Sequence, residues 1–155
     1  GMMASEVARL DLQQDVYLDA AIAHVIVRSG KTTSRPRIIP IVLAPEFIQE
    51  HLPEALQWLQ SQTDSGWSLY LKRYLRNATG NEAISAHGLR HTFKANSVHC
   101  GANPMLVASI AGWSAKESGL SAIMMGYGSD GLSSSEGLKA LWTESKKIHG
   151  HLLVL

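Results

Sequence analysis

Two short runs rich in β-branched residues constrain the fold most: residues 22–28 (IAHVIVR) and residues 37–42 (RIIPIV). β-Branched side chains favour extended backbone, so each run predicts a strand. The polar stretch between them predicts the loop of an antiparallel hairpin, with basic side chains at its tip. Pro40 lacks a backbone N–H, so the second strand is expected at a sheet edge or beside a bulge.

Most of the remaining chain predicts helices. Residues 5–12 predict a short helix with Val7 and Leu10 facing inward. Apolar residues recur at helical spacing from Pro45 onward, and Asn103-Pro104 forms a capping signal for a further helix. The expected longer helices cover about 45–60, 67–77, 87–99, 105–111 and 134 onward. The fold class is therefore α+β, mainly α-helical with a small antiparallel β-sheet, in a single domain spanning 1–155.

Composition is typical of a globular protein in a reducing compartment. Hydrophobic residues make up 45% of the 155 residues and charged residues 17%. No apolar run approaches the ~20 residues that a membrane-spanning helix needs, and no signal peptide is visible. The single cysteine, Cys100, excludes an internal disulfide and is expected to be a small core residue. These features predict a cytoplasmic location.

Charge is unevenly distributed, although the net charge is only +1. Residues 28–94 contain nine Lys and Arg against five Asp and Glu, a balance of +4. The rest contains five basic against eight acidic residues, a balance of −3. A basic middle between acidic ends favours a phosphate backbone as partner, although an ordinary solvated surface explains the charges equally well.

The segment 87–93 (HGLRHTF) combines two imidazoles and a guanidinium. On a helix, His87, Arg90 and His91 share one face, because residues three and four apart are neighbours. A guanidinium binds phosphate with a planar fork of donors, and a histidine beside it can donate to the same phosphate or move a proton. This layout predicts a site for an anionic phosphorus centre.

Two other interpretations of the segment remain open. A histidine pair four residues apart can bind zinc, but the zinc-protease pattern requires Glu after the first histidine, where this chain has Gly88. The residues can also form an ordinary solvated helix face.

Three blocks together resemble the tyrosine recombinases, the phage-integrase family. They are "AHGLRHTF", "GANPMLVASIAGWS" and "GYG", which match a His-x-x-Arg-His block, a helix ending in Gly-Trp, and a later tyrosine. The stretch "VIVRSGKTTSRPRIIPI" is similar to the family's β-hairpin with its catalytic lysine. The resemblance covers nearly the whole chain in the same order. It implies the catalytic fold of a DNA breaking-and-rejoining enzyme, truncated at its N-terminus.

The resemblance implies a role for each matching residue. Tyr127 would attack the scissile phosphate and form a 3′-phosphotyrosyl link, and Lys31 would protonate the leaving 5′ oxygen. Arg90, His87 and Trp113 would donate to the phosphate, with His91 in support. No cofactor and no metal are implied. The expected DNA contacts are Arg28, Arg35, Arg37, Arg73, Arg76 and Lys94.

One departure from the family pattern limits the expected activity. The first block of the family, Gly-x-Arg-x-Ser-Glu, aligns with "GMMASE", which places Met3 where the family has a phosphate-binding arginine. Loss of one such donor typically costs about 10²–10³ in rate. The resemblance thus implies a site-specific recombinase or integrase of a prokaryotic or phage mobile element, located at the nucleoid, that is weak or inactive alone. The alternative is a non-catalytic DNA-binding or partner-binding remnant.

The implied partners are double-stranded DNA and further copies of the chain. Members of the family work as oligomers on DNA that exchange C-terminal segments. The helix from about residue 134 and the apolar tail 152–155 are the candidates for that exchange, and docking on their own domain is the alternative.

Overall fold

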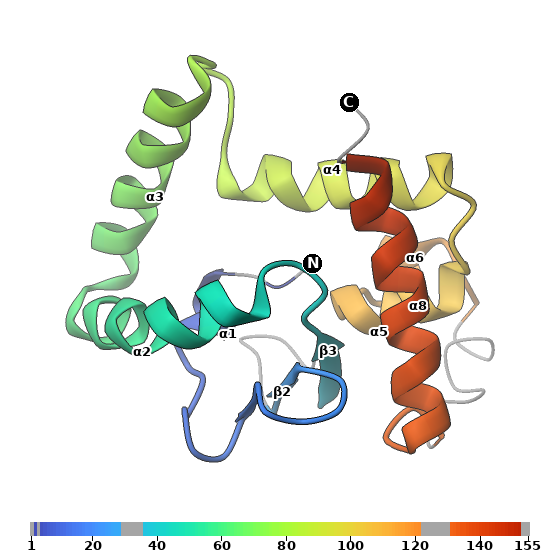
Figure 1. Cartoon of the computed structure of the whole chain (residues 1–155). Coiled ribbons are helices and arrows are strands. Elements are labelled where there is room, and N and C mark those ends of the chain that lie inside the picture. Colours follow the sequence, from blue (N-terminus) through green and yellow to red (C-terminus); the bar gives the residue numbers. More distant parts are fainter. Residues whose placement is uncertain (1, 3, 29–35, 122–130, 153–155) are drawn as a thin grey trace.

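The structure, a computed structural model, describes residues 2, 4–28, 36–121 and 131–152. It is mainly helical with one small antiparallel sheet, which confirms the predicted α+β class (Figure 1). The strands are β1 (Val16–Tyr17), β2 (His24–Val27) and β3 (Arg37–Pro40). The helices are α1 (Ala4–Val7), α2 (Pro45–Ser61), α3 (Asp64–Thr79), α4 (Ala86–His99), α5 (Pro104–Ala111), α6 (Ala115–Ser118) and α8 (Ser135–Leu152).

The sheet has the strand order β1-β2-β3, with both pairs antiparallel. Strands β2 and β3 are the two predicted from β-branched runs, and Pro40 lies on the edge strand β3, as expected. Strand β1 was not predicted, because its surroundings are acidic and turn-like. It is held by pairing rather than by propensity: Tyr17 lies opposite His24, and their rings stack with centroids 4.9 Å apart.

Local capping explains where most helices begin and end. The side chains of Thr63, Ser85 and Asn103 accept hydrogen bonds from the first turns of α3, α4 and α5. The gap expected between the helices over about 45–60 and 67–77 was therefore too long: α2 continues to Ser61, and the Thr63 cap starts α3 directly afterwards. Glycines in the left-handed conformation end α3, α5 and α6.

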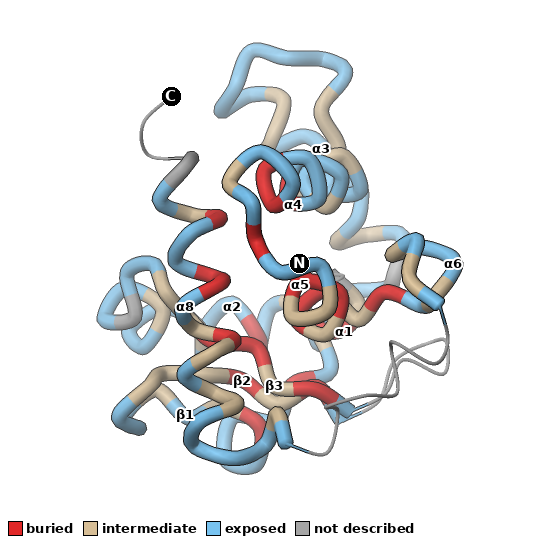
Figure 2. Tube along the Cα trace, turned by 90° about the vertical axis from the view of Figure 1, so that its right-hand side faces the viewer, coloured by how far each residue is buried: buried red, intermediate tan, exposed pale blue. Residues whose placement is uncertain are grey.

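Helix α8 is the element around which the core is arranged. It contacts β3, α4 and α5, and Leu141, Ser145 and Ile148 on it are buried. Buried stretches of α8 are red in Figure 2. Leu10, beyond α1, is also buried, as predicted. The apolar residues predicted at helical spacing on α2 are only partly buried: Leu56 is fully buried, whereas Phe47 is 62% exposed.

The remaining observations concern Cys100 and the membrane. Cys100 is half-buried and packs against the core, close to its predicted role. Among the described residues, no helix combines the length and the apolar character needed to cross a bilayer.

Replacement of Gly112 by alanine should destabilise the fold strongly. Gly112 has φ +65°, and a Cβ there would lie 2.6 Å from Cζ of Arg37. Gly101 is the matched control, because it has φ +64° but no atom within 4 Å of a built Cβ. In both variants an alanine must adopt a left-handed backbone conformation, which costs about 1–2 kcal/mol of folding stability. We expect Gly112→Ala to lose at least about 2 kcal/mol more in urea unfolding, because the guanidinium must move. Equal losses would contradict the close packing of Arg37.

Glu144 should make the free energy of unfolding depend on pH in the acidic range. Burial alone would raise the pKa of Glu144, but hydrogen bonds from Lys147 Nζ and the backbone N–H of Asn103 outweigh it and lower that pKa. A carboxyl whose pKa is lower in the folded chain stabilises above its unfolded pKa, about 4.3, and loses this contribution as pH falls through its folded pKa.

Glu144→Gln should therefore cost about 1–2 kcal/mol at neutral pH. The difference from the unaltered chain should be smaller at about pH 3 than at neutral pH, because pH 3 lies below the unfolded pKa and part of the stabilisation by the carboxylate is then lost. Urea unfolding at the two pH values measures it, with the exposed Glu54→Gln as control. A cost that is the same at both pH values would refute the assignment.

Candidate functional site

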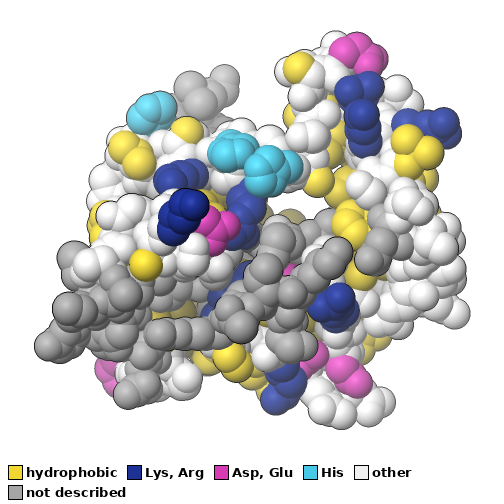
Figure 3. Space-filling view, turned by 180° about the vertical axis from the view of Figure 1, so that it is seen from behind, with side chains coloured by type: hydrophobic (Ala, Val, Ile, Leu, Met, Phe, Trp, Pro, Cys, Tyr) yellow, Lys and Arg dark blue, Asp and Glu magenta, His cyan; other side chains and the backbone are white. Residues whose placement is uncertain are grey.

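The predicted histidine–arginine segment forms the first turns of α4. Ser85 caps this helix by accepting a hydrogen bond from the backbone N–H of Gly88 at 3.0 Å. His87 and His91 are both exposed, with 2.9 Å between their Nε2 atoms and their rings nearly perpendicular. The face of the molecule drawn in Figure 3 carries histidine side chains close to Lys, Arg and acidic side chains.

Arg90 lies between the two histidines in sequence but extends across to α5. Its Nη1 donates to the carbonyl oxygen of Ala111 at 2.8 Å. This carbonyl belongs to the last turn of α5, where carbonyls have no partner inside the helix and the helix dipole is negative. Desolvation lowers the pKa of the half-buried Arg90 guanidinium, while Glu117 and Glu6 oppose the shift. An arginine remains charged at neutral pH in any such setting.

Trp113 lies next to both long cationic side chains of α4. Its ring centroid is 5.6 Å from Cζ of Arg90 and 5.3 Å from Nζ of Lys94, both within cation–π range. Phe93 packs 6.1 Å from the same ring, between centroids, and Trp113 is only 8% exposed. The structure therefore brings the predicted residues Arg90 and Trp113 into contact, and Trp113 is also part of the core.

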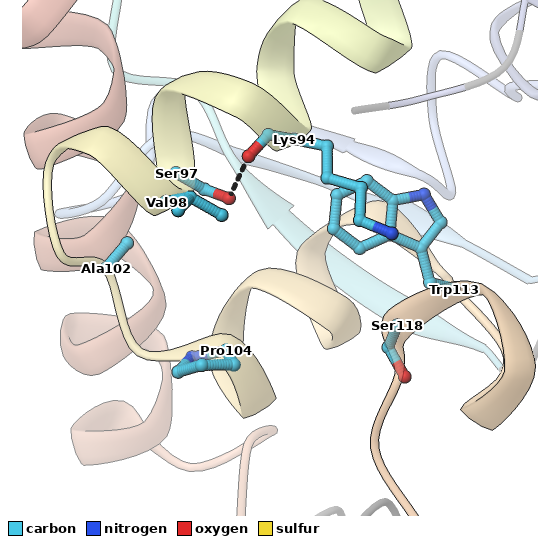
Figure 4. Close-up of a pocket in the computed structure, with 7 residues that line it drawn as sticks. All are labelled: Lys94, Ser97, Val98, Ala102, Pro104, Trp113 and Ser118. Atoms are coloured by element: carbon cyan, nitrogen blue, oxygen red, sulfur yellow. Dashed lines mark hydrogen bonds between the residues drawn. The ribbon is translucent and has the colours of Figure 1, made fainter.

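Lys94 connects α4 to the short helix α6. Its Nζ donates to the backbone carbonyl of Glu117 at 2.6 Å, and its aliphatic chain crosses Trp113 in Figure 4. Glu117 in turn accepts from the backbone N–H and hydroxyl of Ser114, and these bonds lower the pKa of its carboxyl. Neither α6 nor the role of Glu117 was predicted, although Ser114-x-x-Glu117 has capping-box spacing that could have indicated both.

A small apolar pocket adjoins Lys94 and Trp113. It has a volume of about 220 Å³ and is lined from α4, the start of α5 and α6 (Figure 4). Val98 and Pro104 form part of its wall.

Arg37 corrects one prediction. It was expected to contact DNA, but its side chain is buried and bound at both ends of its guanidinium. Nη1 and Nη2 donate to the two carboxylate oxygens of Glu6 at 2.9 and 2.6 Å, and Nε donates to the carbonyl oxygen of Ile110 at 3.2 Å. A guanidinium enclosed in this way cannot also reach a phosphate backbone. Sequence reasoning missed Glu6, which no local pattern links to Arg37.

The other predicted DNA contacts differ in their surroundings. Arg28 is half-exposed and is held by the carboxylate of Asp15 and the carbonyl of Gln14. Arg73 is exposed on α3, and Arg76 pairs with the exposed Glu82 at 3.0 Å. The predicted residues Lys31, Arg35 and Tyr127 lie outside the described residues. The described site therefore consists of His87, Arg90, His91, Lys94 and Trp113.

Among the described residues, no group of three or more His, Cys, Asp or Glu side chains is arranged to hold a metal ion. The comparisons with protein-family models, with curated proteins and with solved structures gave no match to this chain.

Glu6→Gln should destabilise the chain severely. The substitution keeps the shape but leaves the Arg37 charge buried without its counter-ion, because the two side chains are only 1% and 6% exposed. Breaking such a pair costs about 3–5 kcal/mol. In the exposed pair, Glu82→Gln should change stability by less than about 1 kcal/mol. Urea unfolding of both variants measures the contrast, and a small effect of Glu6→Gln would show that Arg37 is not held as described.

Proposed function

We propose that the chain is the C-terminal part of a tyrosine-recombinase catalytic domain and breaks and rejoins DNA strands. The observation that supports this most is the placement of Arg90. It is anchored to the end of α5 beside Trp113, and it follows His87 by one turn of α4. Groups from two separate motifs, each with a donor suited to phosphate, thereby lie close together.

The proposed reaction uses these donors to stabilise negative charge on the phosphate. The phenolic oxygen of Tyr127 gives its proton to His87, acting as the base, and forms a bond to phosphorus while the bond from phosphorus to the 5′ oxygen breaks. The ammonium group of Lys31 gives a proton to the leaving oxygen, which becomes a 5′ hydroxyl. Fixed donors aimed at the developing charge usually make the largest contribution to such catalysis. The covalent phosphotyrosyl link retains the bond energy for rejoining.

The expected activity is weak. Met3 occupies the position of the family's first phosphate-binding arginine, and loss of one donor costs about 10²–10³ in rate. The proposed partners are double-stranded DNA, at the nucleoid of a prokaryotic cell or in a phage context, and further copies of the chain. Helix α8 packs on its own domain, against β3, α4 and α5.

The same departure favours a second candidate, a DNA-binding remnant without catalysis. Met3 removes a catalytic donor, whereas binding depends on the total of many phosphate contacts. The two candidates differ in one respect: only the enzyme forms a covalent bond to DNA.

A covalent-trapping experiment separates them. The chain is incubated with a pool of random-sequence duplexes that carry 5′-bridging phosphorothiolate linkages. Cleavage then releases a thiolate, which needs no proton from Lys31 and rejoins poorly. We expect a small amount of protein–DNA adduct that resists SDS, because the donors on α4 still activate the phosphate.

Tyr127→Phe should abolish the adduct completely, and Arg90→Lys should reduce it by at least about 10²-fold. Tyr70→Phe, on the exposed face of α3, is the matched control and should leave it unchanged. Salt-sensitive DNA binding with no adduct would favour the remnant. An adduct that survives Tyr127→Phe would refute the assigned nucleophile.

A further inference from the structure

The histidine pair on α4 has a second chemical property. The Nε2 atoms of His87 and His91 are 2.9 Å apart, and both side chains are exposed on a regular, capped helix. At this distance one ring donates its Nε2 hydrogen to the lone pair of the other. If the donor ring carries its proton on Nδ1 instead, both Nε2 lone pairs become available to one acceptor.

We propose that His87 and His91 form a two-histidine chelate for a divalent transition-metal ion of the Cu²⁺ or Ni²⁺ type. The chelate requires only the two rings, so it does not depend on the function proposed above.

The two Nε2 atoms are close enough for both rings to bind one ion with metal–nitrogen bonds of about 2.05 Å after small side-chain rotations. The Irving–Williams order places Cu²⁺ first among the divalent ions for imidazole ligands.

Arg90 follows His87 by three positions, and its Nη1 donates to the carbonyl oxygen of Ala111. No third His, Cys, Asp or Glu completes a cluster in the part of the chain that the structure describes. Water would fill the remaining coordination positions.

The chain contains a second histidine pair that serves as an internal control. His149 and His151 are two positions apart on α8, a spacing at which helical side chains do not face each other. Nδ1 of His149 also lies 2.8 Å from the carbonyl oxygen of Ser145. Of these two pairs, the one on α4 has the four-residue spacing at which side chains on a helix are neighbours.

The test is electron paramagnetic resonance of Cu²⁺ bound to the tag-free chain, combined with a titration for affinity. We expect one tight ion with two equivalent imidazole nitrogens in the spectrum. His91→Gln should leave one nitrogen and weaken binding at least about tenfold, because the second ligand no longer acts at high effective concentration. His149→Gln/His151→Gln should change neither spectrum nor affinity. Retention of the tight site in His87→Gln/His91→Gln, or its loss in the α8 variant, would overturn the proposal.

Discussion

The fold depends on the hydrogen bonds made to the carbonyl groups at the C-terminal end of α5. The last carbonyls of a helix have no partners within it and lie at the negative end of the dipole. Here two guanidinium groups supply the missing donors: Arg37 binds the carbonyl of Ile110, and Arg90 binds the carbonyl of Ala111. Gly112 then turns the chain in a conformation that leaves no room for a Cβ beside Arg37. Strand β3, helix α4 and helix α5 are thereby joined at one point.

The two arginines have different roles, one structural and one at the proposed site, because their environments differ. Glu6 neutralises Arg37 inside the protein, so this arginine holds α1 and β3 to α5 and faces no ligand. Arg90 is half-buried, stacks near Trp113 and follows His87 on an exposed helix face. An arginine whose side chain is already anchored has a defined orientation and loses less side-chain entropy when it binds a ligand. This preorganisation is the physical basis of the proposed phosphate site.

Much of the fold followed from local patterns, whereas the pairing of distant groups did not. The hairpin strands, α2, α4 and the Asn103 cap have signals within a few residues, and the structure has them where they were expected. Strand β1 depends on its partner β2, and the short helix α6 depends on a cap of only two side chains, so propensity alone missed both. The charge balance of +4 for residues 28–94 includes Arg37, because the sequence cannot show that Glu6 neutralises this arginine. The candidate site was predictable in its residue types, but the anchoring of Arg90 to a backbone carbonyl carries no sequence signal.

The central claim is that phosphate binds at the α4 face, to Arg90 and Trp113 and not to Arg37. The most direct measurement is a ¹⁵N–¹H spectrum of the arginine Nε–H and tryptophan indole groups during titration with duplex DNA. Signals are assigned with Arg90→Lys and Trp113→Phe. We expect the Arg90 and Trp113 signals to shift together while the signal of the buried Arg37 stays in place. DNA binding that leaves Arg90 and Trp113 unchanged would contradict it.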